Sequence, residues 1–313
     1  MVAMEAADAA AAGNAACELV PLTAADFAAA RKRCGASLVR GLAVEAPPVA
    51  WADVGGCEEV KRRLRQAVEW PLARAGAFRR LALRAPRGVL LYGPPGCAKT
   101  LLARAAAHAS GATLVPLSGA ALFSAFLGEG ERALRAAFRR ARAAAPAIIL
   151  LDEADAVGAR RGGAPGGGSG AEERLLATLL SELDGLGPSH GVLLLAATNR
   201  PAALDAALLR PGRLDTHLFC GPPDRAGRAA ILALHARAMA LAEDVDLEHL
   251  AEATDGCTGA EVAALCAEAA LRALREDGAA QGVALRHFMA ARAAAPPSTS
   301  AELLAEYRAF GRL

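Results

Sequence analysis

A glycine-rich segment at residues 93–100, Gly-Pro-Pro-Gly-Cys-Ala-Lys-Thr, has the residue types and spacing of a polyphosphate-binding turn. It follows an apolar run at 88–92 and precedes an alanine-rich helical run that begins at Leu101. In a turn between a strand and a helix, successive backbone N–H groups and the helix N-terminus point at one spot, which suits an anion. We expect Lys99 to reach the terminal phosphates and the Thr100 hydroxyl to bind Mg²⁺.

Ala98 stands where the pattern of this turn has glycine. A methyl group at a tight phosphate turn raises strain or shifts the lysine, because only glycine is free of the limits that a Cβ imposes. Two functions therefore stay open at this point. One is a nucleotide hydrolase, and the other is a nucleotide-binding structural subunit that hydrolyses little.

Two neighbouring acids, Asp152 and Glu153, follow a second apolar run at 148–151. Buried carboxylates are costly unless they serve a cation or a reaction. At the carboxyl end of a parallel strand, Asp152 can hold Mg²⁺ through water, and Glu153 can polarise an attacking water. The alternative is that both acids favour the dipole of a helix N-terminus. Because the glycine-rich turn and the acid pair occur together, we favour phosphoryl chemistry.

Three further polar residues suit the same chemistry. Asn199 follows the apolar run 192–197, at the sheet edge where open α/β folds bind ligands, and it can orient the water or touch the terminal phosphate. The alternative is a plain strand-end turn before Pro201. Arg210 and Arg213 flank a Pro-Gly turn, and arginine commonly neutralises the charge on a transferring phosphoryl group. In a chain with 35 basic residues, a lone surface arginine would mean little.

Short apolar runs that predict strands alternate with segments of helical periodicity in the first two thirds of the chain. The predicted strands are 88–92, 112–116, 148–151, 192–197 and 217–220. The helical segments include 131–144 and 172–183, and the first of these turns Leu134, Ala137, Phe138 and Ala141 inward. This alternation predicts an α/β fold, in which a parallel sheet carries helices on both faces.

An earlier helix, after the turn at 51–56, has one apolar and one basic side. Its apolar residues are Val60, Leu64, Ala67 and Val68. Its basic residues, expected to face solvent, are Lys61, Arg62, Arg63 and Arg65.

The strand signal ends near Asp224, and the rest of the chain is helical by period. The predicted helices are 224–238, 247–253, 259–275 and 285–293. The third has an apolar stripe of Val262, Leu265, Cys266, Ala269 and Ala273. We therefore expect a low-complexity start and linker at 1–45, an α/β domain at 46–222, a small all-helical domain at 223–295 and a C-terminal helix or tail at 296–313.

Composition excludes several classes of protein. The formal net charge of +2, from 35 basic and 33 acidic residues, gives no case for a nucleic-acid or membrane-surface partner. Seven scattered cysteines, without C-x-x-C or metal spacing, are typical of a reduced intracellular chain. The longest apolar runs are too short to span a bilayer, and we find no targeting segment. We expect a cytoplasmic protein that is also found in the nucleus.

The four motifs, at 93–100, 148–153, 196–199 and 209–215, resemble in their order the AAA group of the AAA+ ATPases. The resemblance implies a P-loop NTPase sheet with a helical lid, and a homo- or hetero-hexameric ring with ATP at its subunit interfaces. It also implies that Asn199 is the first sensor and that Arg210 and Arg213 are arginine fingers. With Glu153 and Lys99, these are the expected catalytic residues, and Thr100 and Asp152 are the expected metal ligands.

The same resemblance names the residues around the nucleotide. The segment 53–56 matches the one whose backbone binds adenine, and 257–261 matches the lid segment that packs on the nucleotide. His235 is similarly placed near the base, although a histidine of the lid core is an equal alternative. The expected ATP-binding residues are Asp53, Val54, Gly55, Pro95, Gly96, Cys97, Ala98, Lys99, Thr100, Leu101, His235, Gly259 and Ala260.

Phe126 and Leu127 resemble the central-pore loop that grips a translocating polypeptide in this family, with core packing as the alternative. The glycine-rich stretch with Arg160 and Arg161 is a second pore loop or a plain linker. The resemblance thus implies a polypeptide substrate and no sequence-specific nucleic acid. An AAA+ motor that depends on nucleic acid is the rival, which the near-neutral charge disfavours.

The N-terminal part refines the resemblance. Residues 22–31 and the linker 47–51 look like the tail of one AAA module leading into another, as in the valosin-containing-protein group. The residues at 96–100 and 118–124 are most similar to the spermatogenesis-associated protein 5-like branch, which implies remodelling of pre-ribosomal particles of the large subunit. A general ubiquitin-linked segregase is the alternative.

Overall fold

The structure, a computed structural model, describes residues 49–83, 85–124, 128–158, 170–186 and 191–311. The chain divides into two compact units, residues 1–42 and 43–313. Every described residue belongs to the second unit. The segment 22–31, expected to be the tail of a preceding module, lies outside the described residues.

The centre of the unit is a five-stranded parallel sheet in the order β2-β3-β4-β1-β5. Its strands are β1 (Gly88–Tyr92), β2 (Thr113–Ser118), β3 (Ala147–Asp152), β4 (Val192–Thr198) and β5 (Leu214–Phe219). The predicted α/β fold is therefore confirmed. The last strand begins at Leu214, three residues before its predicted start, because the backbone of β5 continues along β1 to the pair Gly88 and Leu214.

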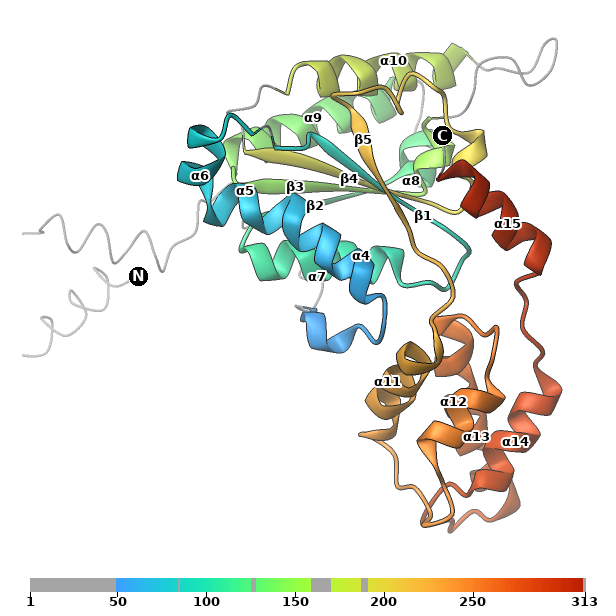
Figure 1. The fold of residues 1–313 in the computed structure, drawn as a ribbon. Coiled ribbons are helices and arrows are strands. Elements are labelled where there is room, and N and C mark those ends of the chain that lie inside the picture. The colour runs from blue at the N-terminus through green and yellow to red at the C-terminus, as the bar shows by residue number, and fades with distance from the viewer. Residues whose placement is uncertain (1–48, 84, 125–127, 159–169, 187–190, 312–313) are drawn as a thin grey trace, which may run out of the picture. The chain divides into compact units, whose positions relative to one another are not determined.

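Helices cover both faces of the sheet (Figure 1). One face carries α8 (Gly119–Ser124), α9 (Glu129–Ala143) and α10 (Gly170–Asp184). The other carries α4 (Glu58–Leu64), a π-helical turn at Arg65–Glu69 and α7 (Lys99–Ser110). Near them lie the short helices α5 (Trp70–Ala73) and α6 (Ala75–Arg80), and the 3₁₀ turns Trp51–Asp53, Ala154–Ala156 and Pro201–Ala203.

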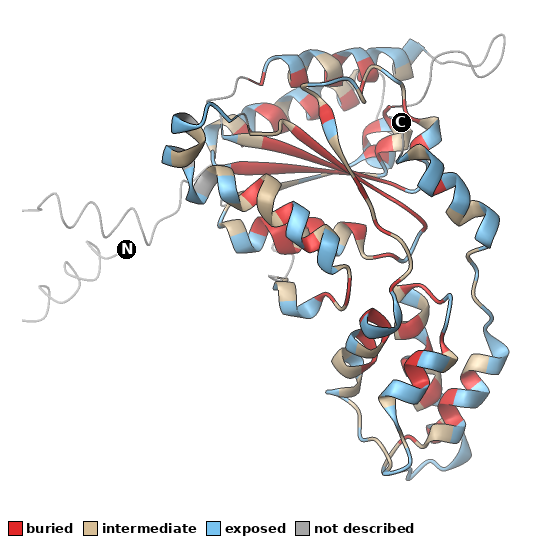
Figure 2. Cartoon of the chain, in the orientation of Figure 1, coloured by how far each residue is buried: buried red, intermediate tan, exposed pale blue. Residues whose placement is uncertain are grey.

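Alternate residues of the central strands enter two different cores. In β3, Ile149 and Leu151 pack with α9 and α10, whereas Ile148 and Leu150 pack with α4 and α7. Successive side chains of a strand point to opposite faces, so a sheet covered on both sides has strands that are apolar throughout. Figure 2 shows the buried residues concentrated on these strands and on the helix sides that face them. The inward residues predicted for α9 are all buried.

Lys61 was expected on the solvent side of α4, and this prediction was wrong. The residue is 5% exposed, while Arg62 and Arg63 are exposed as expected. Lys61 lies three residues before Leu64 and therefore shares its face of the helix. The methylene stem is covered there, and the ammonium reaches Glu58 Oε1 at 2.8 Å.

The helical lid has its own core. Its helices are α11 (Arg225–Ala236), α12 (Leu247–Ala253), α13 (Gly259–Glu276) and α14 (Leu285–Ala294). These agree with the predicted helices to within two residues. The stripe predicted for α13 is buried at each position, because it faces α11 and α14. The lid begins at the N-cap Asp224, whose side chain accepts a hydrogen bond from Gly227 N.

The chain then returns to the α/β domain. A last helix, α15 (Ala301–Phe310), begins at the N-cap Ser300 and packs Leu303, Tyr307 and Phe310 against the core that contains α9 and α10. These residues are spaced i, i+4 and i+7, so they lie on one side of the helix. Figure 1 shows α15 beside the sheet, away from α11–α14.

The part of the chain that the structure describes contains no helix that is both long and apolar enough to span a bilayer.

Candidate active site

A cavity of about 520 Å³ opens at the carboxyl edge of the sheet, between the α/β domain and the lid. Every residue that the sequence predicts for ATP or Mg²⁺ binding lines it, and so do Glu153 and Asn199. Three lid residues that the sequence analysis missed, Ile231, Leu234 and Ala263, line it as well. The volume suits a small-molecule ligand.

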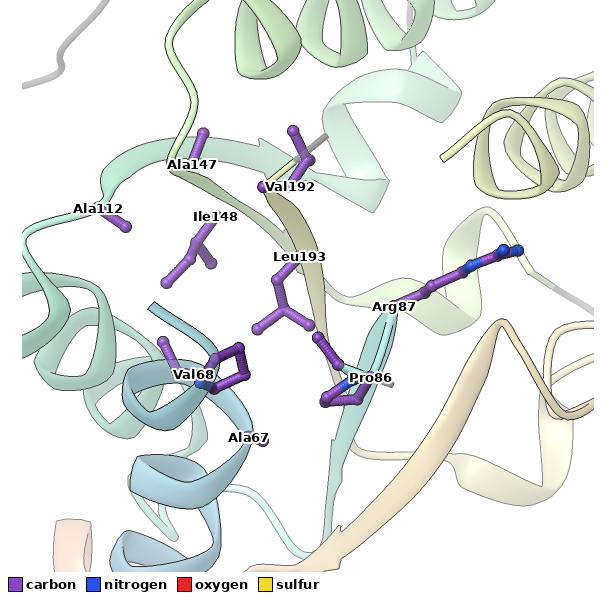
Figure 3. Close-up of a pocket in the computed structure, with 12 residues that line it drawn as sticks. Ala67, Val68, Pro86, Arg87, Ala112, Ala147, Ile148, Val192 and Leu193 are labelled. Carbon is purple, nitrogen blue, oxygen red and sulfur yellow. The ribbon is translucent and has the colours of Figure 1, made fainter. Parts of the chain in front are cut away.

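Among the residues that the structure describes, the amino edge of the sheet offers no comparable site. A small cavity of about 70 Å³ lies there, and Figure 3 shows Val68, Ile148 and Leu193 among the side chains around it. The one charged side chain among its lining residues, Arg87, extends away from it in Figure 3. We therefore place the chemistry at the carboxyl edge.

Lys99 is the first residue of α7 and is 7% exposed. Its Nζ donates to Gly93 O at 2.9 Å and to Pro94 O at 2.7 Å, so the ammonium is held over the glycine-rich turn. Burial lowers the pKa of Lys99, and this effect outweighs the opposing influence of Cys220, Cys97 and Asp152. An anion in the cavity would offset the cost of burying this cation.

Thr100 and Asp152 form the part of the site that suits a divalent cation. The Thr100 hydroxyl donates to Asp152 Oδ2 at 2.7 Å, which joins the start of α7 to the end of β3. Within the described residues, no cluster of three or more His, Cys, Asp or Glu side chains could hold a metal. Mg²⁺ usually takes one or two protein oxygens and completes its shell with water and substrate phosphates. The pair therefore fits Mg²⁺ bound together with a phosphate ligand.

Glu153 adopts a left-handed backbone conformation with φ 53° and ψ 47°. It is exposed to the cavity side of the sheet, and its N–H donates to Asp152 Oδ1 at 3.0 Å. A non-glycine residue in this region is strained by about 1–3 kcal/mol, and such strain concentrates at functional sites. Gly119 permits the conformation, because a Cβ there would lie 2.2 Å from Glu153 O.

Ala98 shares this strain, with φ 56° and ψ 19° at the N-cap of α7. The turn needs a left-handed residue at this position, and that explains the glycine that the motif usually has. Alanine takes the same conformation at a cost in energy. The neighbouring Cys97 is buried, and burial raises the pKa of its thiol to about 12, so it stays a neutral packing group.

The lid touches the turn directly. Ala260 N donates to Gly96 O at 3.0 Å, and a Cβ at Gly96 would lie 2.9 Å from the Ala260 Cβ. The lid also comes close to Gly55, where a Cβ would lie 2.5 Å from the Ile231 Cγ1. Glycine at both positions therefore lets lid residues close over the cavity.

Ile231, Leu234 and His235 line the cavity from one face of α11. Their spacing of i, i+3 and i+4 was a signal that could have identified Ile231 and Leu234 from the sequence. Together with Val54, Ile231 and Leu234 give the cavity apolar lining besides the charged Lys99 and Asp152.

Asn199 directly follows β4 and is exposed in the cavity. Its neighbour Thr198 donates from its hydroxyl to Asp155 Oδ1 at 2.7 Å and accepts from Arg200 N at 2.9 Å. The backbone on the N-terminal side of Asn199 is therefore tied to the segment that carries Asp152 and Glu153.

Arg210 and Arg213 are the expected catalytic residues that do not line this cavity. The Arg213 guanidinium donates to Asp184 Oδ1 at 2.9 Å, to Asp184 Oδ2 at 2.7 Å and to Ala207 O at 2.6 Å. Arg210 is exposed and has no side-chain partner among the described residues. The two arginines therefore differ: Arg213 is bonded within its own chain, whereas Arg210 is exposed to solvent.

Phe126, Leu127, Arg160 and Arg161, the residues expected in pore loops, lie outside the described residues. Phe123 on α8, three residues before Phe126 in the sequence, is an exposed aromatic residue within the described part of the chain; it is 46% exposed.

Comparison with known families agrees with this geometry. The model for the ATPase family associated with various cellular activities (AAA) matches residues 89–222, and the model for the AAA+ lid domain matches residues 244–290. The chain belongs to the AAA family of ATPases. The predicted resemblance is therefore confirmed, for the ATPase domain and for the lid.

Three relatives show the range of similarity. The chain is 50% identical over 92% of its length to cell division control protein 48 homolog B of Arabidopsis thaliana, and covers 48% of that protein. It is 47% identical over 88% to ATPase family gene 2 protein of Schizosaccharomyces pombe, covering 33%. It is 46% identical over 89% to ATPase family gene 2 protein homolog A of Homo sapiens, covering 31%. The chain thus spans about a third to a half of these relatives.

Three described segments of this AAA chain fall outside the ranges that the family models match. Residues 49–88 precede both ranges and include Asp53, Val54 and Gly55 of the cavity. Residues 223–243 lie between the ranges and include Ile231, Leu234 and His235 of the cavity. The third segment follows the second range and contains α15, which reaches the site through the hydrogen bond from Tyr307 to Asn199 O.

Proposed function

We propose that the protein hydrolyses ATP in the cavity at the carboxyl edge of the sheet. The observation that carries this proposal is the hydrogen-bonded pair of Thr100 and Asp152, which lies in the same cavity as Lys99 and Glu153. The pair supplies a site for Mg²⁺, the lysine supplies a cation for phosphate, and the glutamate supplies a base.

Each residue then has a role in ATP hydrolysis. Lys99 and the backbone N–H groups of the turn hold the phosphates, and Thr100 and Asp152 hold Mg²⁺, which neutralises phosphate charge when it is bound. Glu153 polarises a water molecule, whose oxygen forms a bond to the terminal phosphorus while the bond to ADP breaks. Asn199 orients that water.

The apolar lining of the cavity suits the base of the nucleotide. Residues 53–55 line the cavity together with Ile231 and Leu234, and His235 lies on the same face of α11. The close approach of Gly55 to Ile231 supports this assignment, because it brings the two walls near each other.

The substitution Glu153→Gln tests the hydrolytic role. A general base typically contributes 10²–10⁴-fold, so we expect turnover to fall by about 100-fold or more while ATP still binds. The matched control is Glu173→Gln, an exposed acid on α10 that does not line the cavity. Wild-type turnover in Glu153→Gln would reject Glu153 as the activator of water.

The alternative is a structural subunit that binds ATP and hydrolyses little. Ala98 suggests it, because alanine stands where the motif usually has glycine. The left-handed conformation of Ala98 argues against it, because the turn is formed in spite of the methyl group. Steady-state ATPase of the assembled wild-type protein separates the two functions. Rescue of a defective rate by Ala98→Gly would favour the structural subunit for the natural sequence.

We further propose that the protein works as a homo- or hetero-hexamer in which Arg210 and Arg213 reach a neighbouring subunit. The exposure of Arg210 supports this for that residue, whereas Arg213 is held by Asp184 in its own chain. In the assembled protein, Arg210→Ala should abolish turnover without loss of nucleotide binding. Equal turnover in the variant would remove Arg210 from the site.

The proposed substrate is a polypeptide, gripped by a pore loop at Phe126 and Leu127. Pre-ribosomal proteins in the cytoplasm and nucleus are the candidate substrates, on sequence resemblance alone, and a ubiquitin-linked segregase is the alternative. Capture of bound proteins by the Glu153→Gln variant, followed by their identification, decides between them. Stimulation of the ATPase by DNA or RNA would instead support a nucleic-acid motor.

A further inference from the structure

Helix α15 brings an aromatic side chain to the backbone of the site. The Tyr307 hydroxyl donates to Asn199 O at 2.5 Å, across 108 residues of sequence. Tyr307 is 6% exposed, and the hydrogen bond itself is partly buried. The carbonyl that it holds belongs to the residue whose side chain faces the cavity.

Three aromatic contacts hold α15 in this place, and a fourth joins the two strands beneath it. Phe219 of β5 stacks on Tyr307 at 6.1 Å between ring centroids and also lies 5.7 Å from Tyr92 of β1. Phe310 of α15 contacts the rings of Tyr92 at 5.0 Å and His217 at 5.9 Å. The end of the helix is also close-packed, because a Cβ at Gly311 would lie 2.3 Å from the Tyr92 hydroxyl. The position of the Tyr307 hydroxyl is therefore determined by packing.

Asn199 is held from both sides as a result. On one side, Thr198 bonds to Asp155, two residues after Glu153. On the other side, Tyr307 holds the Asn199 carbonyl. Removing either bond frees one side of the backbone from which the Asn199 side chain projects into the cavity.

The segment between α14 and α15 is tied to the lid beside the glycine-rich turn. Ser298 N donates to Glu261 Oε1 at 2.9 Å, and Thr258 N donates to Glu261 Oε2 at 2.7 Å. Glu261 is next to Ala260, which bonds to Gly96 of the turn. Contacts therefore run from the turn through the lid to the connector that leads into α15.

From these contacts we propose that Tyr307 is a positioning residue for Asn199, through which α15 sets the rate of the reaction. The proposal rests on the proposed function, since it assigns Asn199 to ATP hydrolysis. By holding the Asn199 carbonyl, Tyr307 keeps the Asn199 side chain where it meets the terminal phosphate or the water. Nucleotide binding is left to Lys99 and Thr100.

Tyr307→Phe is the test, because it removes the hydroxyl and keeps the ring that stacks on Phe219. We expect kcat to fall roughly three- to tenfold, because small displacements of a positioned group lower the rate steeply. The KM for ATP should stay within about twofold, and the melting temperature should fall by no more than about 3 °C. Tyr92→Phe, which removes a hydroxyl from the same aromatic cluster, should leave all three unchanged.

A double-mutant cycle distinguishes positioning from general loosening. If Tyr307 acts through Asn199, then Tyr307→Phe should cost nothing further in an Asn199→Ala background. An equal loss in both backgrounds, or a parallel rise in KM, would overturn the proposal. So would an unchanged kcat in Tyr307→Phe.

Amide hydrogen exchange keeps this test independent of the proposed function. In Tyr307→Phe, exchange in the segment 199–204 should become about three- to tenfold faster, and in Tyr92→Phe it should not change. If the wild-type protein hydrolyses no ATP but exchange accelerates, the proposed function fails and the restraint on Asn199 stands. Unchanged exchange would overturn the inference whatever the ATPase result.

Discussion

The Arg213 guanidinium holds both carboxylate oxygens of Asp184, which lies 29 residues earlier at the end of α10. This hydrogen bonding raises the pKa of Arg213 and lowers the pKa of Asp184. A third bond, from Arg213 to Ala207 O, ties the pair to the loop before β5. Arg213 therefore stabilises the fold of its own chain.

Replacing Arg213 should cost stability that replacing Arg210 does not. We expect Arg213→Ala to lower the free energy of unfolding by about 1 kcal/mol, a modest value because Asp184 is largely solvated. Arg210→Ala, which removes an exposed side chain with no partner among the described residues, should stay within about 0.5 kcal/mol of the wild type. Urea denaturation of both variants measures this. Equal destabilisation by the two would show that the Asp184 pair contributes nothing.

Gly119→Ala should disturb Glu153. The added Cβ would lie 2.2 Å from Glu153 O and 3.2 Å from Asp152 O, and neither backbone atom can move without shifting the acid pair. Such overpacking typically costs about 1–3 kcal/mol, and we expect ATPase activity to fall with it. Gly76→Ala is the matched control, since no atom lies within 4 Å of its Cβ. Normal ATPase in Gly119→Ala would mean that the contact does not position Glu153.

Ala98 offers a test of backbone strain. Ala98→Gly relieves about 1–2 kcal/mol of left-handed strain and adds about 0.5–1 kcal/mol of unfolded-chain entropy, so we expect a small net gain in stability. Ala98→Val, with a branched Cβ at φ 56°, should lose about 1–3 kcal/mol and weaken ATP binding. Thermal denaturation with and without ATP measures both the stability of each variant and its ATP binding. If Ala98→Val were more stable than the wild type, the backbone at position 98 would not be strained.

Glu59 should titrate far below an ordinary glutamate. Hydrogen bonds from Arg62 and Arg63 lower its pKa from 4.5 to about 2. Because the folded pKa is depressed, the stabilisation is complete above about pH 4.5 and is lost as the pH falls toward 2. NMR of the side-chain carboxyl carbon measures the midpoint. The double variant Arg62→Ala, Arg63→Ala should return it to about 4.3, and a wild-type midpoint already there would rule out the effect.

Local patterns were sufficient for most of the fold. The apolar stripe of α13 and the strands β1 to β4 were predictable because burial repeats with the period of the element. The turn and the acid pair were predictable as a site because strands of a parallel sheet end at one edge. Of the cavity residues on α11, His235 was predicted, whereas Ile231 and Leu234 were missed because they look like ordinary core residues of a lid helix.

Other features depend on contacts that no local pattern carries. Lys61 is buried because it lies on the same side of α4 as Leu64 and its ammonium meets Glu58. The left-handed conformation of Glu153 follows from the approach of Gly119, 34 positions earlier by residue number. The bond between Tyr307 and Asn199 joins residues 108 positions apart. Sequence periodicity reports which side of an element is buried but not what covers it.

The return of α15 to the sheet makes the α/β domain discontinuous along the chain. The lid helices Arg225–Ala294 are synthesised after the sheet but before the helix that covers Tyr92, His217 and Phe219. While a ribosome is still extending the lid, these aromatic side chains lack their covering helix, and exposed apolar surface of this kind favours aggregation. During biosynthesis, the sheet domain therefore becomes complete only after the lid that follows it.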